Sequence, residues 1–403
     1  MASFRSTGFS RGDSGLILTA TGGGFVKLSL IATAAFGLES VVALELKNLG
    51  INDVMVENGK VQFFGDYSTI ARTNLWLRTA DRVLIKVGEF YAESFEELFE
   101  KTKALPWEEF LPKNANFPVT GKAVRSKLMS VSDCQAIVKK AIVERLKGKY
   151  RLNWFPEDGP EFKIEVSLLK DLATLTIDTS GAGLHKRGYR KLTGRAPLRE
   201  TLAAALVILS RWREDRAFSD PFCGSGTIPV EAALIGLNIA PGINREFAFM
   251  KWPWFPKKEL ELAREEARSK RRNLKLLIYG SDISEDELSY ARYHAKAAGV
   301  EKSIRFFKKD FREVKFTEEY GWLISNLPYG ERIGDVREVE KLYRELKILR
   351  EKLPTWSFYF LTSHPAFEKL YGRKADKRRK LYNGKIETQF YQFFGPKPPK
   401  IIL

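Results

Sequence analysis

The chain has 403 residues, enough for two or three domains, and its composition of 44% hydrophobic and 12% aromatic residues is typical of folded proteins. Lys and Arg number 67 against 50 Asp and Glu, and the resulting formal charge of +17 favours a polyanionic partner, nucleic acid before membrane. Since no apolar run reaches the roughly 18 residues of a membrane span, and two cysteines with three histidines suit neither a disulfide framework nor a Cys/His metal site, we expect no membrane, no metal and a cytoplasmic location.

Residues 1–25 are rich in Ser, Gly and Thr and lack the apolar core of a secretory signal. We predict a leader that is disordered or foreign to the natural protein, and a transit peptide is the other interpretation. After it, strand patterns at 28–34, 61–65 and 80–90 and a helix pattern over 38–49 indicate an α+β unit. We assign it residues 26–75, and the strands of 76–90 can also belong to it.

A second unit is predicted over residues 76–180. One helix begins at Ser94, and a longer one opens at Ser132, where Gln135 completes a capping-box pattern. Strand patterns at 118–126, 162–169 and 172–180 complete the unit, and the last two meet in a turn at Lys170-Asp171.

After Gly181, short apolar strands alternate with helices, which predicts a doubly wound, mostly parallel sheet over residues 181–403. The strands fall at 217–220, 276–282, 304–307 and 322–326, and helices begin at Thr227 and Ser284. Near the end, the Asn383-Gly384 turn favours a hairpin and therefore an antiparallel last strand.

The segment 220–227, Asp-Pro-Phe-Cys-Gly-Ser-Gly-Thr, follows one of these strands and opens a helix. Ligands of open α/β sheets bind at such strand ends, where glycines permit close approach and the helix start offers free N–H groups. The pattern is neither the dinucleotide-binding nor the Walker A motif, and a tight turn without a ligand is the other interpretation. Asp282 and the pair Asp310-Phe311 follow the next two strands and offer weaker signals for a ribose and an adenine.

The segment 326–332, Asn-Leu-Pro-Tyr-Gly-Glu-Arg, follows another strand. An exocyclic amine of a nucleobase is a poor nucleophile because its lone pair is delocalised into the ring. The side-chain carbonyl of Asn326 and the backbone carbonyl of Leu327 could accept its two N–H groups and aim the lone pair. Pro328 would stiffen the turn, and Tyr329 would stack on the base. A turn without chemistry is the other interpretation.

These segments, in this order, resemble class I S-adenosylmethionine-dependent methyltransferases. The closest resemblance is to the THUMP-domain RNA guanine-N2 methyltransferases, which include the RlmL-like rRNA enzymes and tRNA enzymes. Residues 30–51 and 118–146 resemble the ferredoxin-like and THUMP segments of that family, so the resemblance implies a ferredoxin-like unit (26–75), a THUMP RNA-binding domain (76–180) and a Rossmann-like methyltransferase domain (181–403). One departure is Leu327, where the family usually has proline, which bears on the stiffness of the turn.

The resemblance implies S-adenosylmethionine as cofactor and assigns roles to residues. Asp282 would hold the ribose, Asp310 the adenine amino group, and residues 197–206 would form a helix beside the methionine end. The implied cofactor-binding residues are Leu198, Thr201, Asp220, Phe222, Gly224, Gly226, Asp282, Ile283, Asp310 and Phe311. The implied catalytic residues are Asn326, Leu327, Pro328 and Tyr329, with direct methyl transfer to nitrogen. Cys223 lies in the cofactor loop and is interpreted as a packing residue.

Three basic regions agree with an RNA partner. Residues 101–150 contain 11 Lys and Arg against 4 Asp and Glu, and residues 371–403 contain 9 against 2. Residues 185–191 interleave cations with Tyr189, so this stretch is expected to bind phosphates and to stack on a base. The residues expected to bind RNA are Lys122, Arg125, Lys127, Lys186, Arg187, Arg190 and Lys191. Solvated charged faces are the other interpretation of each run.

The leading hypothesis is therefore methylation of N2 of a guanosine in rRNA or tRNA. Two alternatives stay open. Adenine N6 methylation would use the same arrangement of acceptors, and analysis of the product nucleoside would distinguish it. A non-catalytic RNA-binding factor with a methyltransferase fold would be recognised by a lack of cofactor binding.

Overall fold

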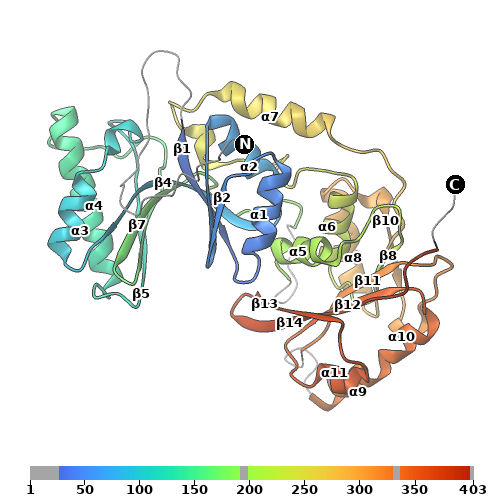
Figure 1. Ribbon diagram of the computed structural model, residues 1–403. Coiled ribbons are helices and arrows are strands. Elements are labelled where there is room, and N and C mark those ends of the chain that lie inside the picture. Colours follow the sequence, from blue (N-terminus) through green and yellow to red (C-terminus); the bar gives the residue numbers. More distant parts are fainter. Residues whose placement is uncertain (1–26, 191–197, 330–335, 400–403) are drawn as a thin grey trace, which may run out of the picture.

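The computed structural model describes residues 27–190, 198–329 and 336–399, which form two seven-stranded sheets, one in each half of the chain (Figure 1). The leader of residues 1–25, Lys191 and the end of the 326–332 segment lie outside the described residues. Within the three described ranges, no helix is long and apolar enough to cross a bilayer, and no cluster of His, Cys, Asp and Glu side chains is arranged to hold a metal ion.

The first sheet has the strand order β2-β3-β1-β4-β7-β6-β5, and all neighbours are antiparallel apart from β5 and β6. Because β4 pairs with β1 on one side and β7 on the other, the two predicted N-terminal units share one continuous sheet. Their residue boundaries stay a prediction. The elements are β1 (Leu28–Ala34), α1 (Glu39–Asn48), β2 (Val54–Glu57), β3 (Lys60–Gly65), α2 (Tyr67–Trp76), β4 (Ala80–Tyr91), α3 (Phe95–Lys103), β5 (Val119–Val124), α4 (Val131–Tyr150), β6 (Ile164–Leu169) and β7 (Leu172–Asp178).

Serine side chains cap the starts of α3 and α4. Ser94 caps α3 as predicted, because its side chain accepts a hydrogen bond from the Glu97 N–H. The predicted start of α4 at Ser132 is wrong: Ser130 is the cap, and its side chain accepts from the Asp133 N–H. Both serines have suitable spacing, and the structure uses the earlier one.

The second sheet has the order β10-β9-β8-β11-β12-β14-β13. It is parallel from β10 to β12, and β14 and β13 are antiparallel, so the predicted class I methyltransferase topology is confirmed. The elements are α5 (Glu200–Ser210), β8 (Phe218–Asp220), α6 (Thr227–Gly236), α7 (Lys257–Ser269), β9 (Ile278–Asp282), α8 (Glu285–Ala297), β10 (Ile304–Lys308), β11 (Trp322–Asn326), α9 (Val336–Glu345), α10 (Lys347–Lys352), β12 (Ser357–Thr362), α11 (Phe367–Tyr371), β13 (Lys377–Asn383) and β14 (Ile386–Phe393).

Both faces of this second sheet are covered, because successive strand residues contribute to two different cores. Leu323 packs with α9, α10 and α11, whereas its neighbour Ile324 packs with α5, α6 and α8. Phe358 and Tyr359 divide in the same way. Alternation of side chains along a strand and burial on both sides explain why the central strands are continuously apolar.

The segment between α6 and β9 leaves the second half of the chain and packs on the first sheet. Figure 1 shows α7 lying beside α2, where Arg72 pairs with Glu266 at 3.0 Å. The Trp252 ring stacks on Phe162 with centroids 4.8 Å apart, and its Nε1–H donates to the Glu161 carbonyl oxygen at 3.0 Å. The core of the N-terminal half is therefore completed by residues of the C-terminal half.

We predict that Trp252→Ala lowers the free energy of unfolding by about 3–5 kcal/mol, because it removes a buried ring from this shared core. Trp154, which is 73% exposed, provides the matched control, and Trp154→Ala should change stability by no more than about 0.5 kcal/mol. Urea unfolding measures both values. Equal stability of the two variants would show that the segment does not hold the halves together.

Candidate active site at the strand ends

The two chemistry-bearing loops emerge from neighbouring strands. Strand β8 pairs in parallel with β9 on one side and β11 on the other, so the three strands end at the same edge of the sheet. The loop 220–227 follows β8, Asp282 ends β9 and Asn326 ends β11. The structure therefore places the predicted cofactor loop and the predicted catalytic segment side by side.

A buried carboxylate joins these loops. Asp220 Oδ1 accepts hydrogen bonds from the Ser325 hydroxyl at 2.6 Å and from the Phe222 backbone N–H at 3.1 Å. Burial raises the pKa of Asp220 to about 7, and the nearby Asp282 carboxylate adds to the rise, while the two hydrogen bonds oppose it. The buried Asp220 carboxylate thus connects the end of β11 to the loop that follows β8.

The cofactor loop depends on two glycines. Gly224 and Gly226 have φ values of +49° and +80°, which residues other than glycine rarely adopt. A Cβ added to Gly226 would also lie only 2.8 Å from the Ala291 Cβ. The Gly224 N–H donates to Asp282 Oδ2 at 2.9 Å, and the Ser284 N–H donates to Oδ1 at 3.0 Å. Each carboxylate oxygen has a further lone pair, so Asp282 can still accept hydrogen bonds from ligand hydroxyls.

An apolar surface adjoins Asp282. The Ile283 side chain is 68% exposed, and the rings of Phe222 and Phe311 lie 5.0 Å apart. The exposed Ile283 and the half-buried Phe222 beside this carboxylate suit a flat base attached to a polar sugar, whereas Phe311 is buried. The Asp310 carboxylate accepts from the backbone N–H of Arg312 and pairs with its guanidinium at 2.6 Å, so the side chain proposed for the adenine amino group already has a partner.

The helix α5 places Leu198 and Thr201, which we predicted beside the methionine end of the cofactor, at its start. Both residues are buried. Cys223 is also buried, and this burial raises the pKa of its thiol well above the ordinary value. The interpretation of Cys223 as a packing residue therefore agrees with its surroundings.

The Asn326 segment is held by backbone hydrogen bonds. The Leu327 N–H donates to the Leu361 carbonyl oxygen of β12 at 3.0 Å, a bond that proline in this position could not make. The Pro328 carbonyl oxygen accepts from the Tyr343 hydroxyl at 2.6 Å, which also lies 2.7 Å from Thr362 Oγ1. With leucine in place of the usual proline, the turn is therefore held by a backbone hydrogen bond to β12 and not by the rigidity of a proline ring.

Tyr329 has a contact that the sequence did not indicate. Its hydroxyl donates to Asn326 Oδ1, the oxygen that we expected to accept a substrate amine. Ser325 and Tyr343 were also missed. Ser325 could have been recognised, because it is a polar residue inside the apolar strand before Asn326. Tyr343 lies in a helix after the segment, and its sequence context does not indicate a role.

The expectation that Arg187 and Arg190 bind RNA needs correction. Arg187 is buried, pairs with Glu231 at 3.4 Å and donates to the Leu184 carbonyl oxygen at 2.6 Å. Arg190 pairs with Glu200 at 3.5 Å and donates to the Leu198 carbonyl oxygen at 2.8 Å. Both guanidinium groups are therefore used inside the protein.

Tyr189, which we expected to stack on a base, is also buried, and its hydroxyl donates to Glu231 at 3.0 Å. The lone acid Glu231 in the apolar helix α6 was the signal for these buried partners. The other candidates differ. Lys122, Arg125, Lys127 and Lys186 are exposed, although Lys122 pairs with Glu165 at 2.8 Å and Lys127 pairs with Glu93.

Comparison with known families decides the class. The family described as "RMKL-like, methyltransferase domain" matches residues 187–392. The chain belongs to this RMKL-like methyltransferase family. The RlmL ferredoxin-like domain and the THUMP domain match residues 29–84 and 92–178, so the resemblance noted from the motifs is confirmed. The family is one of S-adenosylmethionine-dependent methyltransferases.

Two curated relatives cover most of this RMKL-like chain. It is 52% identical to the "Putative RNA methyltransferase YpsC" of Bacillus subtilis, over 93% of this chain and 98% of that protein. It is 34% identical to a "Ribosomal RNA large subunit methyltransferase K/L" of Syntrophotalea carbinolica, over 91% of this chain and 53% of that enzyme. The chain thus spans about half the length of the K/L enzymes that it matches.

Two solved structures share the whole fold of the RMKL-like chain. One, from Listeria monocytogenes, is described as a "predicted N6-adenine-specific DNA methylase" and is 55% identical, with a TM-score of 0.88 over 92% of this chain and 97% of that one. The other is SMU.472, "a putative methyltransferase complexed with SAH", which is 47% identical, with a TM-score of 0.88 over 93% and 99% of the two chains.

We predict that Tyr343→Phe lowers kcat for methyl transfer about tenfold and leaves cofactor affinity unchanged, because it frees the Pro328 carbonyl and keeps the buried ring. Tyr371→Phe is the matched control, since Tyr371 is buried in the same core and its hydroxyl has no hydrogen-bond partner among the described residues. Steady-state kinetics with calorimetric cofactor titration measure both. Equal kcat values for the two variants would contradict a role of the Tyr343 hydroxyl in positioning the Asn326 segment.

The pKa of Asp220 predicts a pH-dependent stability. Because folding raises this pKa from 3.8 to about 7, the folded state retains a proton that the unfolded state has released. The contribution of this retained proton to the free energy of unfolding is fully present below pH 4 and is lost as the pH rises through 7. Asp220→Asn keeps an acceptor for Ser325, so its free energy of unfolding should rise relative to wild type between pH 5 and pH 8. Asp286→Asn, on the surface, is the control, and parallel pH profiles for wild type and Asp220→Asn would contradict the raised pKa.

Proposed function

We propose that this protein transfers a methyl group from S-adenosylmethionine to the exocyclic N2 of a guanosine in rRNA or tRNA. The observation that carries the proposal is the Ser325–Asp220 hydrogen bond, which fixes the Asn326 segment beside the cofactor loop. A loop for an adenosyl cofactor and a pair of acceptors for an amine are the two parts that amino methylation needs. Both lie at one edge of the second sheet.

The residues of the cofactor loop fit the adenosyl group. Asp282 would accept hydrogen bonds from the ribose hydroxyls, Ile283 and Phe311 would contact the adenine, and Leu198 and Thr201 would lie toward the methionine end. The cofactor, when bound, supplies a methyl group activated by a sulfonium sulfur. Gly224 and Gly226 let the backbone come close to it, and the buried surroundings exclude water from the transfer.

At the other end of the site, the protein orients the amine. Asn326 Oδ1 and the Leu327 carbonyl oxygen would each accept one N–H of the target, which aims the nitrogen lone pair at the methyl group. The Tyr329 hydroxyl now donates to Asn326 Oδ1, so the incoming amine would replace this hydrogen bond. The Tyr329 ring would then stack on a base that has left its helix.

RNA is the substrate that the rest of the chain favours. The THUMP domain matches residues 92–178, and the formal charge of the chain is +17. The curated relatives are described as RNA and ribosomal RNA methyltransferases. Lys122, Arg125, Lys127 and Lys186 are the exposed cations that we retain as candidates for phosphate contacts.

Methylation of adenine N6 is the second candidate, because a homologous structure carries that description and the paired acceptors serve either base. Analysis of nucleosides after reaction with labelled cofactor and protein-free rRNA or tRNA distinguishes the two. N2-methylguanosine supports our proposal. N6-methyladenosine would overturn its choice of base.

We predict that Asn326→Ala lowers the rate of methyl transfer roughly 100-fold or more, because the amine loses one of its two acceptors. Cofactor affinity should stay close to that of wild type, since the hydrogen bond that the Asn326 side chain accepts comes from Tyr329 and not from residues 220–227. Asn48→Ala, at the exposed end of α1, is the control and should keep full activity. A rate equal to that of wild type in Asn326→Ala would exclude the proposed role of this side chain.

A further inference from the structure

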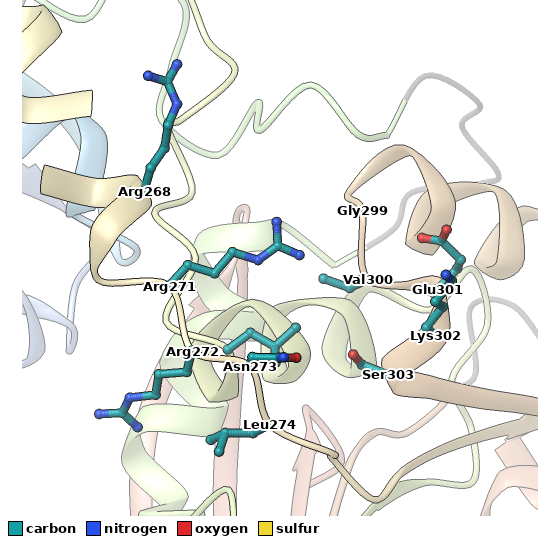
Figure 2. Close-up of a pocket in the computed structure, with 11 residues that line it drawn as sticks. Arg268, Arg271, Arg272, Asn273, Leu274, Gly299, Val300, Glu301, Lys302 and Ser303 are labelled. Atoms are coloured by element: carbon teal, nitrogen blue, oxygen red, sulfur yellow. The ribbon is translucent and has the colours of Figure 1, made fainter. Parts of the chain in front are cut away.

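A second polar site lies at the edge of the methyltransferase sheet opposite to the cofactor loop. A groove of about 690 Å³ lies between the connection from α7 to β9 and the connection from α8 to β10 (Figure 2). Both connections lead into the amino ends of their strands, whereas Asp282 and Asn326 lie at carboxyl ends. The groove is therefore separate from the candidate active site.

The groove is strongly basic. Arg268, Arg271, Arg272 and Lys302 line it, against one acidic residue, Glu301. The first three belong to the run 268–275, which contains five Lys and Arg residues and no acidic residue. The lining also contains no aromatic ring. A site with these properties suits phosphate groups and not stacked bases.

Three of these cations have no partner among the residues that the structure describes. Arg272 pairs with Glu214 at 2.5 Å. In contrast, Arg268, Arg271 and Lys302 form no ion pair or side-chain hydrogen bond with any residue of the ranges 27–190, 198–329 and 336–399. Figure 2 shows Arg271 extending from its connection toward Gly299 and Val300 on the other wall. Their charges are therefore available to a ligand.

Helix ends explain only part of this cluster. Helices α6, α7 and α8 all end near the groove, and the partial negative charge of a helix C-terminus attracts cations. This accounts for Arg268, which lies in the last turn of α7. Arg271 and Lys302 lie beyond the ends of α6, α7 and α8, so their position calls for a different explanation.

We propose that the groove defined by Arg268, Arg271 and Lys302 binds backbone phosphates of the RNA substrate, at a segment away from the target nucleotide. The proposal rests on RNA being the substrate, as argued above. Strand β9 has five residues and therefore four rises of about 3.3 Å, so the groove at its amino end lies about 13 Å or more from Asp282. An RNA bound at both places would extend beyond its target nucleotide over at least this distance.

The test uses the full chain with the combined variant Arg268→Ala, Arg271→Ala and Lys302→Ala. The matched control is Lys47→Ala, Lys347→Ala and Lys369→Ala, which removes the same charge from exposed lysines that form no ion pair with a described residue. Calorimetric titration with S-adenosylmethionine and thermal unfolding first establish that both variants keep their fold and cofactor site.

Affinity for protein-free large-subunit rRNA is then measured against salt concentration. We expect the groove variant to bind at least about tenfold more weakly than wild type and to lower the slope of log K against log salt by about 2–3, as the loss of two or three phosphate contacts requires. The control variant should stay within about threefold of wild type. Identical behaviour of the two variants would overturn the proposal for the groove and leave the proposed function standing.

Two further outcomes are decisive. If wild type binds the cofactor but no RNA, the proposed function fails and the groove proposal fails with it. Inorganic phosphate and ATP serve as small-anion probes. Suppose that millimolar phosphate or ATP raises the melting temperature of wild type but not that of the groove variant, and that wild type and the groove variant bind rRNA with equal affinity. The groove is then a site for a small anion, and the RNA proposal is overturned.

Discussion

The Asp220 carboxylate is the point on which the arrangement of the site depends. It ends β8, accepts from the Phe222 N–H of the cofactor loop and accepts from the Ser325 hydroxyl of the neighbouring strand β11. Because methyl transfer requires the donor and the acceptor at a fixed separation, a buried hydrogen bond between their two strands sets a distance that flexible loops could not. The raised pKa of Asp220 reflects the cost of burying this carboxylate.

A second constraint acts between the two halves of the chain. The segment around Trp252 and α7 belongs to the methyltransferase half in sequence and to the N-terminal core in space. Arg379 adds a contact on the other side, since its guanidinium donates to the Gly37 carbonyl oxygen at 2.6 Å. The THUMP-containing half is therefore held at a fixed position relative to the strand ends. This geometry suits a substrate that binds to the THUMP-containing half and is modified at the strand ends of the second sheet.

Sequence reasoning predicted the second sheet and the two loops well, because strand ends, glycines and helix starts are local patterns. It failed where partners are distant. The cations Arg187 and Arg190 looked like surface residues, since nothing nearby shows that Glu231 and Glu200 meet them inside the fold. The role of Tyr343 could not be predicted for the same reason, because Tyr343 and its partner Pro328 are 15 residues apart in the sequence. The stiffness of the turn at Leu327 depends on a bond to β12, which only the folded sheet supplies.

The central claim is that the Ser325–Asp220 hydrogen bond holds the proposed catalytic segment beside the proposed cofactor loop. The most direct test is the single-turnover rate of methyl transfer by Ser325→Ala at saturating S-adenosylmethionine, with the cofactor affinity measured in parallel. The account predicts a rate about tenfold or more below wild type, with cofactor affinity within about threefold. A wild-type rate in Ser325→Ala would contradict it.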